Sequence, residues 1–171
     1  MNNFIKDLYF TLCNQSPYDF PENAKLGFPQ GGSNRNEYSD ISAHLPMLHF
    51  LALHVESIVE IGVRNCYSTS AFLLAKKELW SIDLNTSPVI EALQTENLPN
   101  WHFIQGDSTS DEVANQLPDF FDMLFIDGLH TYNQVKKELE TYHKSVNKFI
   151  AFHDTALHSQ GVYSRDIVGQ T

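Results

Sequence analysis

Five short apolar runs, separated by stretches with helical periodicity, are the feature that most limits what this chain can fold into. The runs are SIVEIGV (57–63), ELWSID (78–83), WHFIQG (101–106), FDMLFID (121–127) and KFIAFHD (148–154). They lack a strict polar–apolar alternation, which is typical of strands that are buried on both faces of a sheet. Because helical stretches intervene, consecutive strands have to be parallel. We therefore expect an α/β fold with a doubly wound, mostly parallel sheet and helices on both sides.

The segment before the first run is predicted to form a region of its own. Within residues 1–56, the patterns at 3–13 and 39–54 favour helices, and the intervening residues 14–38 are rich in Pro, Gly, Asn and Ser. We expect this N-terminal region of helices and loop to cover the functional site, although a solvated tether for the first helix fits the composition equally well. Residues 57–171 are predicted to form the core.

The charge of the chain argues against several classes of partner. The formal net charge is −10, and the eleven Lys and Arg residues form no basic stripe, so we expect neither a nucleic acid nor a membrane surface as a partner. Lys6 and Asp7 interrupt the first apolar stretch, and no stretch approaches the ~20 apolar residues of a membrane span. Cys13 and Cys66 make no disulfide framework. We expect a cytoplasmic protein.

Polar or charged side chains end nearly every apolar run. Asp83, Asp107 and Asp127 end or directly follow the second, third and fourth runs, and His153 and Asp154 end the fifth. A single acid at such a position is often only a helix cap. Because the carboxyl ends of parallel strands meet at one edge of the sheet, the whole set predicts a ligand crevice there.

The first turn points to a nucleoside without phosphates. Gly62 allows the backbone to approach a ligand closely, and Asp83 lies 21 positions later, where dinucleotide folds place the acid that binds a ribose diol. From Gly62 the chain reads GVRNCY, so the G-x-G-x-x-G fingerprint of pyrophosphate binding is not met. This disfavours an NAD-binding module.

Five segments in order resemble a known family. VEIGVRNCYSTSAFLLA, WSIDLN, FIQGDS, FDMLFIDGLHTYNQVKKELE and FIAFHDT are similar to motifs of the class I S-adenosylmethionine-dependent methyltransferases. The most similar branch is the small-molecule O-methyltransferase-like one (methyltransferase family 24 type), whose fourth strand ends in FIDG-x-H-x-Y. The resemblance covers residues 39–155. It implies a Rossmann-like methyltransferase fold, S-adenosyl-L-methionine as cofactor and methylation of an oxygen of a small-molecule acceptor.

The resemblance also implies roles for individual residues. Ser68 would open the first core helix beside the carboxylate of the cofactor, and Asp83 would hold its ribose hydroxyls. Asp107 and Ser108 would meet the adenine edge, and Asp127 would lie under the transferred methyl group. The full set of implied cofactor-binding residues is Glu60, Gly62, Arg64, Ser68, Asp83, Leu84, Gly106, Asp107, Ser108 and Asp127.

Methyl transfer from a sulfonium requires an acceptor oxygen that is positioned and made anionic by a base or a metal ion. We assign Asp127 and His130 as catalytic residues, with His130 as the candidate base because an imidazole titrates near pH ~6.5. Asp127 and Asp154 end neighbouring strands, and their oxygens would suit Mg²⁺. Helix capping by the two acids and simple packing of His130 are the alternatives.

Two departures from the family pattern keep other functions open. Cys66 stands at the second glycine of the pattern, where we expect a side chain to crowd the cofactor or to resist a positive φ. Only 17 residues follow Asp154, so the usual C-terminal antiparallel pair is expected to be missing, and the open strand edge predicts a homodimer. The alternatives are a cofactor-binding or metal-binding protein without methyl transfer, and a hydroxylase-type relative of the same fold.

Overall fold

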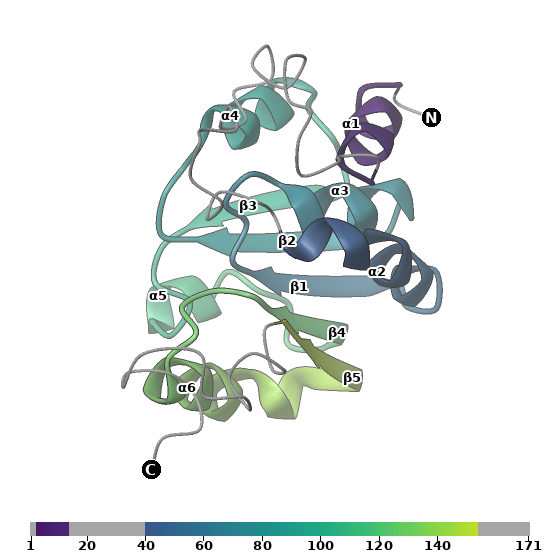
Figure 1. Cartoon of the computed structure of the whole chain (residues 1–171). Coiled ribbons are helices and arrows are strands. Elements are labelled where there is room, and N and C mark those ends of the chain that lie inside the picture. The colour runs from purple at the N-terminus through teal and green to yellow at the C-terminus, as the bar shows by residue number, and fades with distance from the viewer. Residues whose placement is uncertain (1–2, 14–39, 154–171) are drawn as a thin grey trace.

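The computed structural model describes residues 3–13 and 40–153, and its centre is a parallel sheet of five strands. The strands lie in the order β3-β2-β1-β4-β5 (Figure 1). All five apolar runs are strands, which confirms the predicted α/β fold. Their bounds are β1 (Ser57–Ile61), β2 (Glu78–Asp83), β3 (Trp101–Gln105), β4 (Phe121–Ile126) and β5 (Val146–Phe152).

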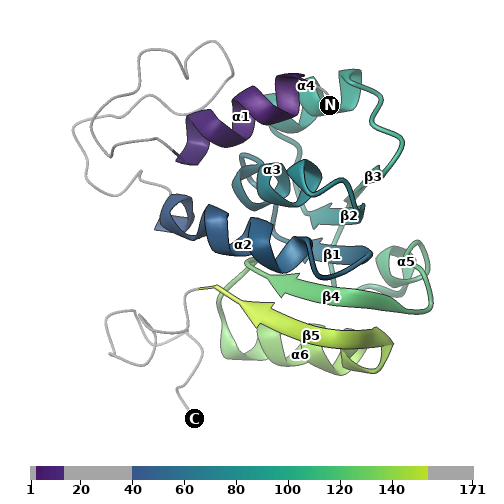
Figure 2. The ribbon, with the colours of Figure 1, turned by 90° about the vertical axis from the view of Figure 1, so that its right-hand side faces the viewer.

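Helices cover both faces of this sheet. Apolar side chains of α1, α2, α3 and α4 form the core on one face, and those of α5 and α6 form the core on the other. Figure 2 shows α1, α2 and α3 on one side of the strands and α6 beside β5. None of the described helices is long and apolar enough to cross a membrane. Their bounds are α1 (Asn3–Cys13), α2 (Leu45–Ala52) after a 3-10 turn η2 (Asp40–His44), α3 (Tyr67–Leu74), α4 (Pro88–Thr95), α5 (Asp111–Ala114) and α6 (Tyr132–Tyr142), followed by η3 (His143–Ser145).

The continuous apolar runs follow from burial on both faces of the sheet. In β4, Met123 packs into the core on the α1–α4 face, and its neighbour Leu124 packs into the core on the α5–α6 face. Ile58 and Val59 divide between the two cores in the same way in β1. Successive side chains of a strand point to opposite faces, so both faces of these strands need apolar side chains.

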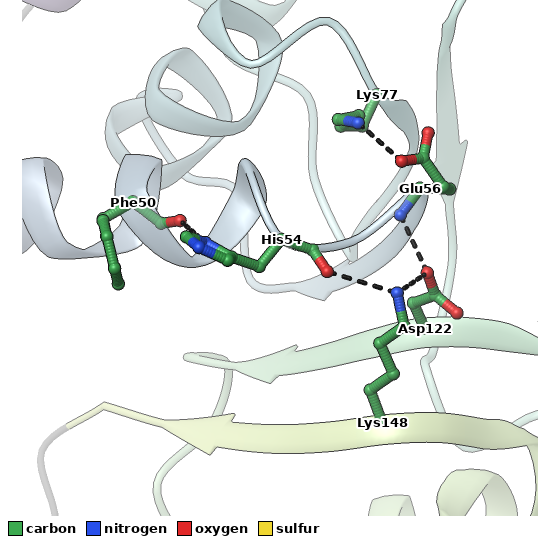
Figure 3. Close-up of polar contacts among 6 residues, drawn as sticks. All are labelled: Phe50, His54, Glu56, Lys77, Asp122 and Lys148. Carbon is green, nitrogen blue, oxygen red and sulfur yellow. Dashed lines mark hydrogen bonds and ion pairs between the residues drawn. The ribbon is translucent and has the colours of Figure 1, made fainter.

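A cluster of polar contacts lies at the edge of the sheet where β1 and β4 begin. Asp122 Oδ2 accepts hydrogen bonds from the backbone N–H of Glu56 (2.8 Å) and from Lys148 Nζ (2.9 Å), as Figure 3 shows. Lys148 Nζ also donates to the carbonyl of His54 (3.2 Å). These contacts connect β4 and β5 to the segment that leads into β1. The Lys148 ammonium and then the Glu56 amide lower the pKa of Asp122.

The free energy of unfolding of an Asp122→Ala variant is expected to be about 1–3 kcal/mol lower than that of the wild type, because the Glu56 amide and the Lys148 ammonium both lose their acceptor. The pKa of Asp122 is lower in the folded state, so this contribution is present above pH ~4 and is lost as the pH falls further. Urea denaturation at pH 7 and at pH 3 measures both effects. Glu56→Gln is the matched control: the side chain of Glu56 is 80% exposed, so stability should change by less than about 0.5 kcal/mol. An equal loss in both variants would contradict the assignment.

Candidate active site

The largest group of sequence-predicted site residues surrounds one pocket at the carboxyl ends of β1, β2, β3 and β4. This pocket has a volume of about 380 Å³. The chain proceeds from β1 outward to β2 and β3 and then returns to the other side of β1 for β4, so the pocket lies where the strand order reverses. Its lining consists of Ile61, Gly62, Arg64, Ile82, Asp83, Leu84, Gly106, Asp107, Ser108, Asp127, Gly128, Leu129, Gln134 and Glu138.

Gly62 joins the loop after β1 to the loop after β4. Its φ is +91°, a conformation that side chains disfavour. A Cβ at this position would lie 2.2 Å from the backbone oxygen of Asp127. The Asp127 N–H donates to the carbonyl of Ile61 (2.8 Å), which continues the pairing of β1 with β4. The predicted close approach at Gly62 is therefore an approach to the protein's own backbone.

Asp83 ends β2 and shapes the first turn with its carboxylate. Oδ2 accepts hydrogen bonds from the backbone N–H groups of Val63 and Arg64, both at 2.9 Å, and Oδ1 accepts from the N–H of Asn85 (3.0 Å). Arg64 itself has a φ of +49°. Asp83 thus lines the pocket and also holds the turn that forms its wall.

Glu60 and Ser68 lie behind the pocket and are not among its lining residues. Glu60 is fully buried, and its carboxylate accepts hydrogen bonds from the hydroxyls of Ser68, Thr69 (2.8 Å) and Ser81 (2.6 Å). Burial raises the pKa of Glu60 to about 7, and the three hydroxyls oppose that rise. Through these bonds Glu60 connects β1 and β2 to the first turn of α3. The hydroxyl-rich segment YSTS is the sequence signal for such a contact.

The expected crowding by Cys66 is not found. Cys66 adopts the left-handed conformation, with φ +61° and ψ +31°, although it carries a side chain. The side chain is fully buried in the core on the α3 face and does not line the pocket. Burial raises the pKa of its thiol well above the usual value. The backbone therefore takes the conformation that a glycine would take, and the thiol points away from the ligand space.

Three acidic or amide side chains form the end of the pocket beside β3. Asp107 Oδ1 accepts from the backbone N–H and the hydroxyl of Thr109, both at 2.8 Å, and these bonds lower the pKa of Asp107. Glu138 Oε1, on α6, accepts a hydrogen bond from Nε2 of Gln134 on the same helix (2.9 Å). It accepts a second one from the hydroxyl of Ser108, in the loop after β3 (2.6 Å). Burial raises the pKa of Glu138. Sequence reasoning missed Gln134 and Glu138, although their spacing of four places them on one helix face.

Histidines surround Asp127 at the β4 side of the pocket. Asp127 Oδ1 lies 3.1 Å from His153 Nδ1 and 3.5 Å from His130 Nε2. The ring of His44, at the end of η2, lies edge-on to that of His153 with centroids 5.5 Å apart. His130 therefore lies beside Asp127, the other residue that the sequence assigns to catalysis. His153 directly follows β5 and reaches this edge of the sheet, as its place at the end of the fifth apolar run predicts, but its contact with Asp127 was not predicted.

Of the two predicted metal ligands, Asp127 and Asp154, the described residues include Asp127. Within residues 3–13 and 40–153, no group of three or more His, Cys, Asp or Glu side chains is arranged to hold a metal ion. Asp154 lies outside the described residues, as do residues 14–39, which include the loop expected to cover the site. Asp127 is therefore the one predicted metal ligand whose surroundings are known.

The chain is similar to known methyltransferases. A family model described as a methyltransferase domain matches residues 59–155. No match was found among curated protein sequences. Among solved structures, a candidate caffeoyl-CoA O-methyltransferase from Staphylococcus aureus has a TM-score of 0.62 and 22% identity, over 95% of this chain and 79% of that one.

Two further structures were solved with ligands. The O-methyltransferase TomG from Streptomyces achromogenes, involved in tomaymycin synthesis and bound to S-adenosylmethionine, has a TM-score of 0.64 and 15% identity, over 94% of this chain and 76% of that one. The MycE methyltransferase of mycinamycin biosynthesis, in complex with Mg and S-adenosylhomocysteine, has a TM-score of 0.53 and 15% identity, over 74% of this chain and 36% of that one. At these identities the likeness establishes the fold.

Proposed function

Because the chain belongs to the family of methyltransferase domains, which its residues 59–155 match, we propose that it methylates an oxygen of a small molecule with S-adenosylmethionine as the methyl donor. The observation that carries this proposal is the pocket at the reversal of the strand order. The first turn, Asp83 and Asp127 all reach it from different strands. The O-methyltransferases of similar fold support an oxygen as the target.

The lining of the pocket fits a nucleoside that carries no phosphates. Arg64 is the one cationic side chain among its described lining residues, whereas Asp83, Asp107, Asp127 and Glu138 are acids. Such a lining repels a pyrophosphate and favours donor groups such as ribose hydroxyls, an amino group and a sulfonium. S-adenosylmethionine would supply an electrophilic methyl group in this pocket.

Asp127 and His130 are proposed to prepare the acceptor. The transfer breaks the bond between sulfur and methyl carbon, forms a bond from that carbon to the acceptor oxygen and requires the hydroxyl proton to leave. His130 Nε2 would take this proton, and the carboxylate of Asp127, 3.5 Å away, would stabilise the resulting imidazolium. His153, at 3.1 Å from the same oxygen, would hold Asp127 in place.

Mg²⁺ assistance is the second form of this mechanism. Asp127 together with Asp154 would hold the ion, and the ion would lower the pKa of an acceptor hydroxyl that binds to it. The magnesium in the structure of MycE favours this form. A small-molecule acceptor is proposed in both forms.

An Asp83→Ala variant is expected to bind S-adenosylhomocysteine more weakly by roughly 1.5–3 kcal/mol, because it removes a charge-assisted contact to the ribose. It also removes the acceptor of the Val63 and Arg64 N–H groups, so the turn should loosen. Titration calorimetry measures the affinity, with NAD as the negative ligand. Asp111→Ala, at the start of α5 and outside the pocket lining, is the control and should bind normally. Unchanged affinity in Asp83→Ala would contradict the nucleoside assignment, and preference for NAD would contradict the proposed function.

A further inference from the structure

The outward side of α2 is apolar and has no role in the proposed methyl transfer. Met47 and Phe50 lie on this helix and Leu53 is its C-cap residue, and their side chains are 59%, 55% and 52% exposed. Their spacing of three residues places them on one side of the helix, which we call the α2 face. The opposite side of α2 packs into the core through Leu45 and Leu48. A helix that is apolar on both sides is typical of one that is covered on both sides.

The α2 face lies in a stretch of the chain without formal charge. Residues 41–55 contain no Asp, Glu, Lys or Arg, although the formal net charge of the chain is −10. Two copies of so acidic a chain repel each other, so they associate most readily through a surface that carries no charge. The same net charge disfavours an anionic lipid surface as the occupant of this face. A second copy of the chain, in contrast, offers an uncharged apolar surface of the same shape.

Charged side chains border the carboxyl-terminal end of the α2 face. Lys148 Nζ donates to the carbonyl of His54 (3.2 Å), and Glu56 pairs with Lys77 (2.8 Å), as Figure 3 shows beside Phe50. Both signs of charge are therefore present along this border. An apolar centre with a polar rim is the usual anatomy of an interface between proteins.

The edge strand β5 is a less suitable surface for association. It is the last strand of the sheet, and Lys148 on this strand has a side chain that is 45% exposed. A lysine on an edge strand discourages pairing with another chain, because the added strand would cover part of its charge. The α2 face carries no such charge, so it is the better candidate for an interface.

We propose that a second copy of this chain docks on the α2 face, with the two α2 helices crossing about a two-fold axis close to Phe50. In a two-fold interface the same patch of both subunits meets, so each contact occurs twice. Phe50 is the middle one of the three exposed side chains. An antiparallel crossing would therefore bring Phe50 to its own counterpart and Met47 to Leu53 of the partner subunit. The inference is independent of the proposed function, because none of these three residues lines the pocket.

The size of the α2 face predicts a weak dimer. Side chains of this size that are about half exposed offer on the order of 100 Å² each. Their sum is smaller than the ~800 Å² per partner of a standard interface, so flanking residues have to add area at the rim. We expect a dimer with a Kd of about 1–100 µM.

Sedimentation velocity of the full chain over about 1–300 µM, which brackets this range, tests the proposal. The wild-type chain should shift from monomer to dimer as its concentration rises. Phe50→Glu would place two like charges at the axis and should weaken the dimer by about thirtyfold or more. Phe120→Glu is the matched control, because Phe120 precedes β4 with its side chain 65% exposed, and it should dimerise like the wild type. Circular dichroism checks that both variants are folded.

A covalent trap tests the two-fold arrangement. In a Cys13→Ser background, where the remaining Cys66 is buried, a chain with Met47→Cys is mixed with a chain with Leu53→Cys and oxidised. The mixture should yield a disulfide-linked dimer, whereas Phe120→Cys in the same background should stay monomeric. Absence of the covalent dimer would overturn the antiparallel crossing.

Two results of the sedimentation experiment would overturn the docking of a second copy on the α2 face. A wild-type chain that stays monomeric over the whole range would leave the face to another part of the chain or to another partner. A dimer that Phe50→Glu leaves unchanged would place the interface elsewhere, with the edge of β5 as the next surface to examine.

Discussion

A His130→Ala variant is expected to turn over substrate roughly 10²–10⁴-fold more slowly than the wild-type chain, because the acceptor hydroxyl loses the base that takes its proton. The affinity for S-adenosylhomocysteine should stay the same, since His130 is not among the lining residues of the pocket. Release of S-adenosylhomocysteine in the presence of a panel of small hydroxylated acceptors measures the rate. The wild-type rate should fall toward acid pH, where an imidazole is protonated, and the variant should lack this acid limb.

Two comparisons separate His130 from its surroundings. His153→Ala removes the imidazole that lies nearer to Asp127, at 3.1 Å, and should lower the rate less than His130→Ala if His153 only positions the carboxylate. A normal rate with an intact acid limb in His130→Ala would refute the base assignment. If a chelator abolishes the activity and Mg²⁺ restores it, the metal-assisted form is favoured, and Asp127→Asn should then remove the stimulation by the metal.

A Gly62→Ala variant is expected to be destabilised by about 3 kcal/mol or more, or not to fold at all. Two independent costs combine: the φ of +91°, and a Cβ that would lie 2.2 Å from the backbone oxygen of Asp127. A backbone atom cannot yield as a flexible side chain can, so β1 and β4 would have to separate. Urea denaturation monitored by circular dichroism measures the loss.

Gly128→Ala is the control for this experiment, because it lies at the same junction of β1 and β4. A Cβ added at Gly128 would meet the side-chain Cγ2 of Ile61 first, at 3.3 Å, and this group can adjust by a small rotation. We expect the variant to lose less than about 1.5 kcal/mol. Equal stability of the two variants would show that the close approach at Gly62 is tolerated.

The sheet and the position of the site were predictable because both follow from the order of the elements along the chain. Continuous apolar runs with helices between them are compatible with few sheet topologies. In any of these topologies, parallel strands bring Asp83, Asp107 and Asp127 to the same edge of the sheet. The turn glycine was also predictable as a place of close approach. Its partner was not, because the sequence does not show that the opposing atom belongs to the backbone of Asp127.

The parts of the site that the sequence did not reveal depend on side-chain packing between distant segments. Glu60 reads as a pocket residue at the end of a strand, yet alternation along β1 turns it toward α3, where three hydroxyls bind it. In the sequence, Glu138 is one of two acids in the charged helical segment KKELE, which gives no sign of a buried contact. Its partner Ser108 lies 30 residues earlier in the chain, and only the fold brings the two together. His153 likewise meets Asp127 only through the pairing of β5 with β4.

The junction of Gly62 and Asp127 also has a consequence for motion. The N–H of Gly62 bonds to the carbonyl of Ile82 (2.9 Å) and that of Asp127 to the carbonyl of Ile61 (2.8 Å), so each loop begins as an extension of a central strand. Neither loop can swing open without breaking the sheet behind it. The amide hydrogens of these two residues should therefore exchange with solvent only through global unfolding, and the adjustments that admit a ligand have to come from segments outside these central strands.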